Sequence, residues 1–115
     1  MTMLNIESKE QERLVMQARL DGAKSQAERN RLGQFATPTA LARDILAYAK
    51  NRFRKKTPIR FLDPALGTGS FYSAFLKVFG EDAASVAMGF EIDSLYVNAA
   101  RLLWKDSGLD VRHED

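Results

Sequence analysis

The chain has no cysteine, a single histidine, three prolines and no long apolar run among its 115 residues. The lack of cysteine excludes disulfides, thiolate nucleophiles and cysteine-based zinc sites, and one histidine argues against a Ser-His-Asp triad. No apolar run approaches the roughly 18 to 20 residues that span a bilayer, so we expect no membrane contact. The N-terminal stretch also lacks the apolar segment of a signal peptide. These absences predict one soluble, cytoplasmic domain.

What the chain does contain is a folded composition with an uneven distribution of charge. Hydrophobic residues make up 45% and aromatic residues 10% of the sequence, which excludes a chain disordered throughout. Residues 1–60 contain 13 Lys or Arg against 6 Asp or Glu, whereas residues 61–115 contain 4 against 9. The basic first half suggests contact with a polyanion. The acidic second half suggests a site that accepts hydroxyl or amine groups or binds a cation.

Residues 1–32 predict one or two polar helices that either pack on another part of the molecule or fray. Ser8 and Gln11 form a capping-box pattern ahead of a thin apolar stripe that includes Leu14 and Val15. We treat this segment as an N-terminal helical extension of a domain formed by residues 33–115. A clearer helix start follows, with Thr37 as N-cap and the next proline at the first helical position. Its predicted buried stripe comprises Leu41, Ala42, Ile45, Leu46 and Ala49.

The remainder alternates between strand and helix patterns. Strands are predicted at residues 59–63, 86–91 and 109–113, with one helix at 71–79 and another that Ser94 caps and that runs to about residue 107. The inward-facing residues predicted for the last helix are Leu95, Ala99, Leu102 and Leu103. This order predicts an α/β fold with a three-stranded parallel sheet, flanking helices and the N-terminal helical extension. Ligands of such sheets bind beyond the carboxyl ends of the strands.

A glycine loop follows the first predicted strand, where residues 63–71 read D-P-A-L-G-T-G-S-F. Gly67 and Gly69 allow a tight turn and close approach of a ligand, toward which the next helix points free N–H groups. The loop has no Gly-Lys-Ser/Thr triplet, and Tyr72 replaces the third glycine of a dinucleotide fingerprint. Asp63 would repel phosphate but suits a ligand with an ammonium group or hydroxyls. It also has a purely structural interpretation, as an acceptor for the backbone of its own loop.

Acidic residues end the second and third predicted strands as well. Glu91 follows Asp63 by 28 residues, one βαβ unit later, and its carboxylate can accept from both hydroxyls of a ribose. Ile92 could contact an adjacent base, and Asp115 could accept from an exocyclic amine. Amino-acid end, ribose and adenine together fit S-adenosylmethionine better than NAD or ATP.

These segments resemble class I S-adenosylmethionine-dependent methyltransferases, and more narrowly the N6-adenine DNA methyltransferases of restriction–modification systems. Residues 33–38 (G-Q-F-A-T-P) resemble the family's motif at the methionine end of the cofactor, and residues 63–71 resemble its first core motif. Residues 89–93 resemble the ribose-binding second motif, and residues 113–115 the third, whose aspartate binds the adenine amine. The resemblance implies a partial Rossmann-like methyltransferase fold, DNA as partner and no metal. It assigns cofactor contacts to Phe35, Thr37, Asp63, Ala65, Gly67, Gly69, Phe71, Glu91, Ile92 and Asp115.

The family's catalytic motif, Asn/Asp-Pro-Pro-Tyr/Phe, has no counterpart, because the chain contains no Pro-Pro pair. We therefore expect the cofactor-binding portion of an adenine-N6 methyltransferase, with no catalytic residue in this chain. Two alternatives stay open. One is a non-catalytic cofactor-binding or assembly module, and the other is part of an RNA or protein methyltransferase.

The resemblance also predicts an open edge of the sheet. In the family the first strand is central and lies beside a fourth strand. Without that strand, Phe61 and Leu62 belong to an edge strand although their run reads as interior. We expect a fragment or one half of a split enzyme, with either a complementing segment or self-association through this edge.

Overall fold

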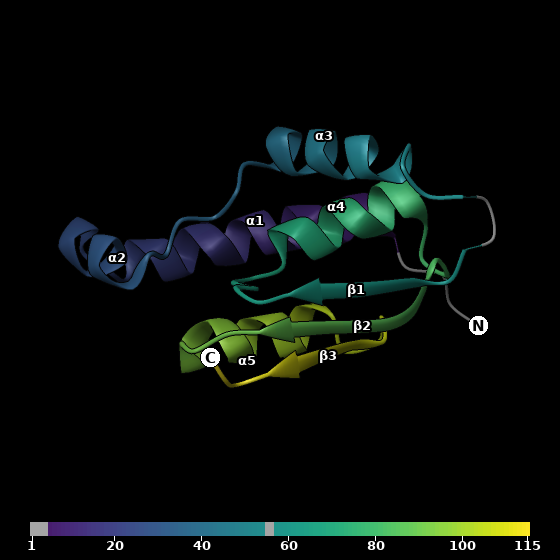
Figure 1. Ribbon diagram of the computed structural model, residues 1–115. Helices are drawn as coiled ribbons and strands as arrows, with labels where there is room; N and C mark the ends of the chain where they lie inside the picture. Colours follow the sequence, from purple (N-terminus) through teal and green to yellow (C-terminus); the bar gives the residue numbers. More distant parts are fainter. Residues whose placement is uncertain (1–4, 55–56) are drawn as a thin grey trace.

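Three short strands rich in aliphatic and aromatic residues form a parallel sheet in the order β1-β2-β3 (Figure 1). The computed structural model describes residues 5–54 and 57–115, so residues 1–4 of the expected extension lie outside the described part. The elements are α1 (Ile6–Gly22), α2 (Gln26–Leu32), α3 (Thr39–Lys50), β1 (Ile59–Asp63), α4 (Ser70–Phe79), β2 (Ala84–Phe90), α5 (Ser94–Leu103) and β3 (Leu109–Arg112). The expected α/β fold, a three-stranded parallel sheet with flanking helices, is confirmed. Among the described residues, no helix is both long and apolar enough to cross a bilayer.

The hydrophobic core lies between the sheet and the helices α4 and α5. Crossovers that proceed in one direction along a parallel sheet place their helices on the same face, and α1 contacts both of these helices. From β1, the Phe61 ring lies 5.3 Å from Tyr72 and 5.1 Å from Phe75 of α4, measured between ring centroids. Buried side chains of β2 and β3, Ala87 and Val111, belong to the same cluster.

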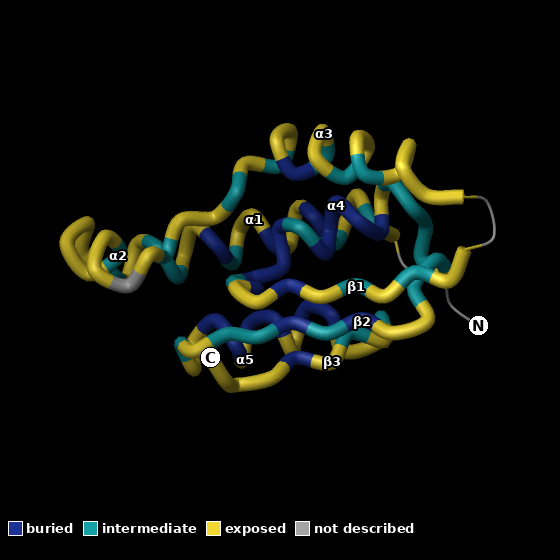
Figure 2. Tube along the Cα trace, viewed as in Figure 1, coloured by how far each residue is buried: buried dark blue, intermediate teal, exposed yellow. Residues whose placement is uncertain are grey.

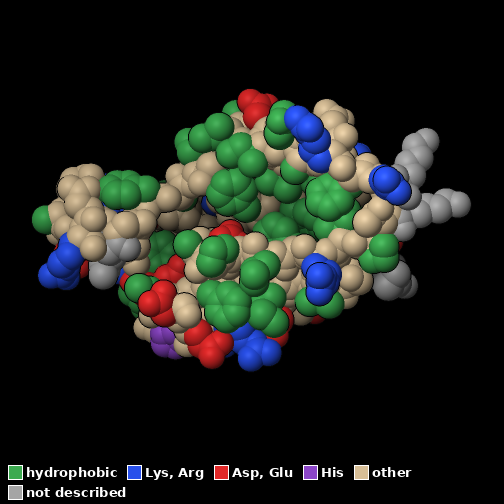
Figure 3. All heavy atoms as spheres, viewed as in Figure 1, with side chains coloured by type: hydrophobic (Ala, Val, Ile, Leu, Met, Phe, Trp, Pro, Cys, Tyr) green, Lys and Arg blue, Asp and Glu red, His purple; other side chains and the backbone are tan. Residues whose placement is uncertain are grey.

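The other face of the sheet is open. Side chains alternate along a strand, and Leu62 and Val86, which point away from the core, are 61% and 51% exposed. Figure 3 shows hydrophobic side chains gathered over β1 and β2 on this face. Among residues 5–54 and 57–115, β1 pairs only with β2, so Phe61 and Leu62 lie in an edge strand as expected.

The helix starts differ by one to three residues from the sequence-based predictions. The capping box at Ser8 and Gln11 is wrong, because α1 begins earlier and the Asn5 side chain accepts from Ser8 N at 3.1 Å. Thr37 is not an N-cap either. Pro38 has an extended ψ of 143°, which delays α3 by one residue and leaves no side-chain cap. Asp93 rather than Ser94 caps α5, as its side chain accepts from Leu95 N.

Two predicted apolar stripes are rotated about their helix axes. In α5, Leu95 and Leu102 are 52% and 60% exposed, because the helix instead buries the side that carries Tyr96 and Trp104 follows at its end. In α3, Leu41 and Ile45 are exposed, since this helix packs mainly on α4 through a narrow stripe centred on Ala42 (Figure 2).

The helix α1 reverses the expected polarity of a packed helix. Leu14 and Val15 are exposed, whereas Glu10, Arg13 and Gln17 are 4%, 1% and 8% exposed. Their spacing of three and four residues puts them on one helix face. Arg13 makes a bidentate contact to Glu10, with Nε–Oε1 and Nη2–Oε2 distances of 2.7 and 2.8 Å. The fully buried side chains of α1 are therefore held by polar contacts, while Ile6 and Met16 pack partly buried against the core.

Hydroxyl groups from two other helices complete the environment of the Glu10 carboxylate. Thr39 of α3 donates at 2.6 Å and Ser73 of α4 at 2.7 Å. Burial alone raises the pKa of Glu10, but the hydrogen bonds from Arg13, Thr39 and Ser73 outweigh it and lower the pKa to about 2. The folded protein therefore stabilises the ionised form of the Glu10 carboxyl group.

The depressed pKa of Glu10 predicts acid sensitivity. Its stabilising effect is present in full above its ordinary pKa of 4.5 and is lost as the pH falls toward the folded-state value of about 2. The difference corresponds to about 3 kcal/mol of unfolding free energy. Urea denaturation between pH 6 and pH 2 measures this loss. Glu12→Gln, a change of an exposed carboxyl on the same helix, should keep the acid sensitivity of the wild type. An NMR titration midpoint of Glu10 near 4.5 would contradict the prediction.

Candidate functional site

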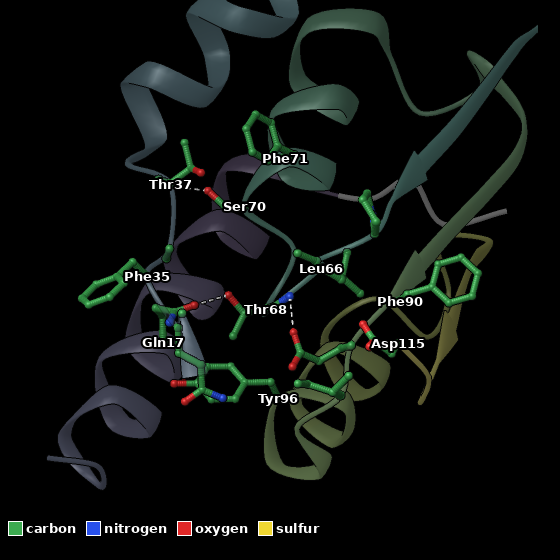
Figure 4. Close-up of a pocket in the computed structure, with 18 residues that line it drawn as sticks. Gln17, Phe35, Thr37, Leu66, Thr68, Ser70, Phe71, Phe90, Tyr96 and Asp115 are labelled. Atoms are coloured by element: carbon green, nitrogen blue, oxygen red, sulfur yellow. Dashed lines mark hydrogen bonds between the residues drawn. The ribbon is translucent and has the colours of Figure 1, made fainter. Parts of the chain in front are cut away.

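A pocket lies at the carboxyl ends of the three strands, where loops from separate parts of the chain meet (Figure 4). Its wall is formed by the glycine loop after β1 and the start of α4, the end of β2 and the segment after it, the last residue, the stretch between α2 and α3, and one side chain each of α1 and α5. The lining residues are Gln17, Gly33, Gln34, Phe35, Ala36, Thr37, Pro64, Ala65, Leu66, Gly67, Thr68, Ser70, Phe71, Phe90, Glu91, Ile92, Tyr96 and Asp115.

The glycine loop folds across the end of β2. Leu66 N donates to the Phe90 carbonyl at 2.8 Å, and Gly69 N donates back to the Leu66 carbonyl at 3.0 Å. The Asp63 carboxylate accepts from Ala65 N at 3.0 Å and so fixes the start of the turn. These bonds place the loop directly in front of the first turn of α4.

Gly69 is required by both its backbone and its surroundings. Its φ is +98°, in the left-handed region, and a Cβ at this position would lie 2.5 Å from Nε1 of Trp104. The Trp104 indole needs this proximity because Nε1 donates to the Thr68 carbonyl at 2.8 Å. Trp104, at the end of α5, thereby holds the backbone of the glycine loop in place.

Glu91 ties two loops together from the end of β2. Its Oε1 accepts from Gly67 N and its Oε2 from Asp93 N, both at 2.9 Å. Gly67 has a φ of +59°, which turns its N–H toward this carboxylate. An ionised carboxylate has about four lone-pair positions, so each oxygen keeps one for a ligand.

The segment between α2 and α3 closes the opposite side of the pocket. The Thr37 carbonyl accepts from the Ser70 hydroxyl at 2.5 Å, at the first residue of α4. Gln34 Nε2 donates to Asp93 at 2.7 Å, and Lys24 forms an ion pair with the same carboxylate. Burial raises the pKa of Asp93, but these two donors outweigh it and hold the pKa below its usual range. The Gln34 Oε1 atom is buried without a partner among the described residues.

Eight of the ten residues assigned by resemblance line this pocket: Phe35, Thr37, Ala65, Gly67, Phe71, Glu91, Ile92 and Asp115. They come from four stretches of sequence, and the structure brings them together. Gly69 does not reach the pocket wall, because it faces Trp104. Asp63 also lies outside the lining, 8% exposed beneath its own loop. Its structural interpretation is therefore the one that the contacts support.

The second carboxylate oxygen of Asp63 is buried without a hydrogen-bond partner among the described residues. Burial raises the pKa of this carboxyl and the nearby charge of Glu91 raises it further, against the bond from Ala65 N. The surroundings of Asp63, next to the glycine loop, therefore disfavour the ionised form of its carboxyl group.

Several pocket residues were not predicted from the sequence. Gln17 and Tyr96 come from helices whose patterns were interpreted as extension and core, and Thr68 was counted only as part of a turn. Thr68 Oγ1 donates to Gln17 Oε1 at 2.6 Å, a contact visible in Figure 4. Tyr96 donates to Asp21 at 2.8 Å, and burial together with this bond raises its pKa. These three residues could be identified only once the long-range packing of α1 against the glycine loop and α5 was known.

The arrangement can bind a polar ligand with an apolar part, because the pocket wall contains both acceptors and apolar side chains. The acceptors are Glu91 and Asp115, whereas Ile92 and Phe35 offer side chains that are 54% and 57% exposed. Groups of three or more acidic, histidine or cysteine side chains able to hold a metal are absent from residues 5–54 and 57–115. A scan against family models found no match to this chain, and a search of solved structures found none either.

A comparison of two glycines tests the packing beneath the loop. Gly69 and Gly108 have φ values of +98° and +90°, but only Gly69 has an atom within 4 Å of the added Cβ. Gly108→Ala should lower the unfolding free energy by about 1–3 kcal/mol through backbone strain alone. Gly69→Ala should lower it by about 1–3 kcal/mol more, because Trp104 must move. Urea denaturation of both variants measures the difference, and equal destabilisation would contradict the proposed close approach.

Proposed function

We propose that the pocket binds S-adenosylmethionine and that the chain is the cofactor-binding portion of an adenine-N6 DNA methyltransferase with a Rossmann-like fold. The observation that carries the proposal is the convergence of eight resemblance-assigned residues on one pocket. Six of them follow strands whose carboxyl ends share one edge, but Phe35 and Thr37 precede the sheet, so the order of strands alone does not bring them to it. The same pocket lies where parallel sheets bind their ligands.

Each end of the cofactor has a matching group. The ribose hydroxyls would donate to the free lone pairs of Glu91, with Gly67 N still bonded to the same carboxylate. Adenine would lie against Ile92 with its amine near Asp115. The methionine end would face the α4 N-terminus and the Gln34 amide oxygen, a buried acceptor.

In the complete enzyme, the N6 amine of an adenine flipped out of DNA would attack the cofactor's methyl group in line. The sulfonium makes that methyl labile, so the protein acts mainly by orientation. The catalytic motif expected to hold the target base is absent from this sequence. We therefore assign binding to this chain and methyl transfer to its assembly with the missing part.

Calorimetry with S-adenosylhomocysteine and its 2′-deoxy counterpart tests the role of Glu91. Wild type should bind S-adenosylhomocysteine saturably, and loss of the 2′-hydroxyl should weaken binding by about 10- to 100-fold, as expected for a hydrogen bond to a charged group. In Glu91→Ala the two ligands should bind equally weakly. Glu12→Ala, at an exposed position of α1, should retain the preference.

The outcomes separate binding from residue assignment. No saturable binding by folded wild type would overturn the cofactor proposal. Saturable binding with the same 2′-hydroxyl preference in Glu91→Ala would assign the ribose to another acceptor. Circular dichroism of each variant is needed alongside, because Glu91 also holds Gly67 N and Asp93 N.

We also infer that the open side of β1 takes up another strand, either from a complementing segment or from a second copy. Parallel sheets are covered on both faces, whereas here the exposed Leu62 and Val86 stand beside an edge that has unpaired backbone groups.

Light scattering at increasing protein concentration tests self-association. If β1 pairs between copies, the mass should rise above that of the 12.9 kDa monomer. Leu62→Lys should then restore the monomer, because a charge on an edge strand disfavours pairing. Leu102→Lys is the matched control, since Leu102 on α5 is 60% exposed and Leu62 61%. A clean wild-type monomer at high concentration would count against self-association and leave the complementing segment.

A further inference from the structure

A continuous chain of polar contacts runs along the buried face of α1, and the proposed function does not account for it. The residues Glu10, Arg13, Gln17 and Asp21 recur at helical spacing. At one end, Glu10 accepts from hydroxyls of α3 and α4. At the other end, Gln17 Nε2 donates to Asp21 at 2.9 Å, and Asp21 accepts from Tyr96 of α5. The chain of contacts thus joins three helices through a fourth.

The middle of this chain is the glycine loop. Arg13 Nη1 donates to Thr68 Oγ1 at 3.2 Å, and the same hydroxyl donates to Gln17 Oε1 at 2.6 Å. Thr68 is 1% exposed and lies between the two glycines of the loop. Its carbonyl is held separately by Trp104. Side chains of α1 therefore hold the Thr68 hydroxyl, and Trp104 at the end of α5 holds the Thr68 carbonyl.

The ion pair with Glu10 fixes the orientation in which Arg13 contacts Thr68. Arg13 is oriented by its bidentate contact to Glu10, so only its Nη1 end projects toward the loop. Neither Glu10 nor Arg13 lines the pocket. The direct contact of this pair to a pocket-lining residue is the one to Thr68, whereas Glu10 also contacts Thr39 of α3 and Ser73 of α4.

We propose that Glu10 and Arg13 of α1 are positioning residues of the binding site, which hold the glycine loop in its ligand-ready conformation through the Thr68 hydroxyl. On this account the N-terminal helix is part of the site. The expected effect on ligand affinity rests on the proposed function, whereas the effect on the loop conformation can be measured without any ligand.

Hydrogen exchange of the ligand-free protein tests the proposal. The amides to follow are Gly67 N, which donates to Glu91, and Gly69 N, which donates to the Leu66 carbonyl. In the double variant Glu10→Met, Arg13→Met, which removes both charges together, exchange at these amides should accelerate at least 10-fold. Exchange at Ala87 and Met88 in the sheet should change by less than twofold, which distinguishes loop positioning from general destabilisation.

The matched control uses the other ion pair with the same spacing on α1. Lys9 and Glu12 are three residues apart and form a 3.4 Å contact at the surface. The variant Lys9→Met, Glu12→Met should leave loop exchange unchanged. Loop exchange within twofold of wild type in a folded Glu10→Met, Arg13→Met protein would overturn the proposal, as would equal acceleration in sheet and loop.

A second pair of variants applies if the double variant does not fold. Thr68→Val removes the hydroxyl with little change of shape, and Thr68→Ser restores it. Exchange at Gly67 and Gly69 should accelerate in the valine variant and return toward the wild-type rate in the serine variant. Equal exchange in both variants would overturn the role of the hydroxyl.

Calorimetry with S-adenosylhomocysteine then tests whether the loop conformation affects ligand affinity. Affinity should fall at least 10-fold in Glu10→Met, Arg13→Met and stay unchanged in Lys9→Met, Glu12→Met. Unchanged affinity in a variant whose loop exchanges faster would show that the loop conformation does not limit binding and would overturn the ligand-ready part. Absence of binding by wild type would contradict the proposed function alone, because loop exchange still decides the positioning role.

Discussion

The buried ion pair between Glu10 and Arg13 is the interaction on which both the helical layer and the glycine loop depend. Two charges that are 4% and 1% exposed have lost their hydration, and only well-placed partners offset that loss. Those partners come from three places in the chain: Thr39, Thr68 and Ser73. A displacement of α1 by one turn would leave the charges without them. Such a pair selects one position of the helix more than it adds stability.

The pocket depends in a similar way on a second carboxylate. Glu91 uses one lone pair of each oxygen for a backbone N–H of the surrounding loops, so a structural role and a ligand role are compatible in the same side chain. Asp63 differs, because its only described bond is to its own loop and its second oxygen is buried. The two acids look alike in the sequence, at the ends of neighbouring strands. Their surroundings give one an open side and the other none.

The sequence predicted the order of the strands and helices, whereas the N-caps of three helices lie one to three residues from their predicted positions. Strand and helix alternation gave the parallel sheet, and Gly80 ended α4 where predicted. The site residues on the strand ends converged because the carboxyl ends of parallel strands share one edge. The packing of α1 was not predictable in this way. Its exposed Leu14 and buried Arg13 contradict amphipathic patterning, and the burial of Arg13 is explained by Thr39 and Thr68, 26 and 55 residues away in the sequence.

The pocket and the open edge occupy different parts of the same sheet. The pocket is lined by residues that follow the strand ends and by α1 and the stretch before α3. The edge is the side of β1, and neither Leu62 nor Val86 lines the pocket. The contacts that hold the glycine loop come from the side chains of Arg13, Glu91, Trp104 and Asp63, and they do not use the free backbone edge of β1. A strand added to β1 would therefore extend the sheet without rebuilding the loop. The pocket and the free edge of β1 are therefore separate regions of this fold.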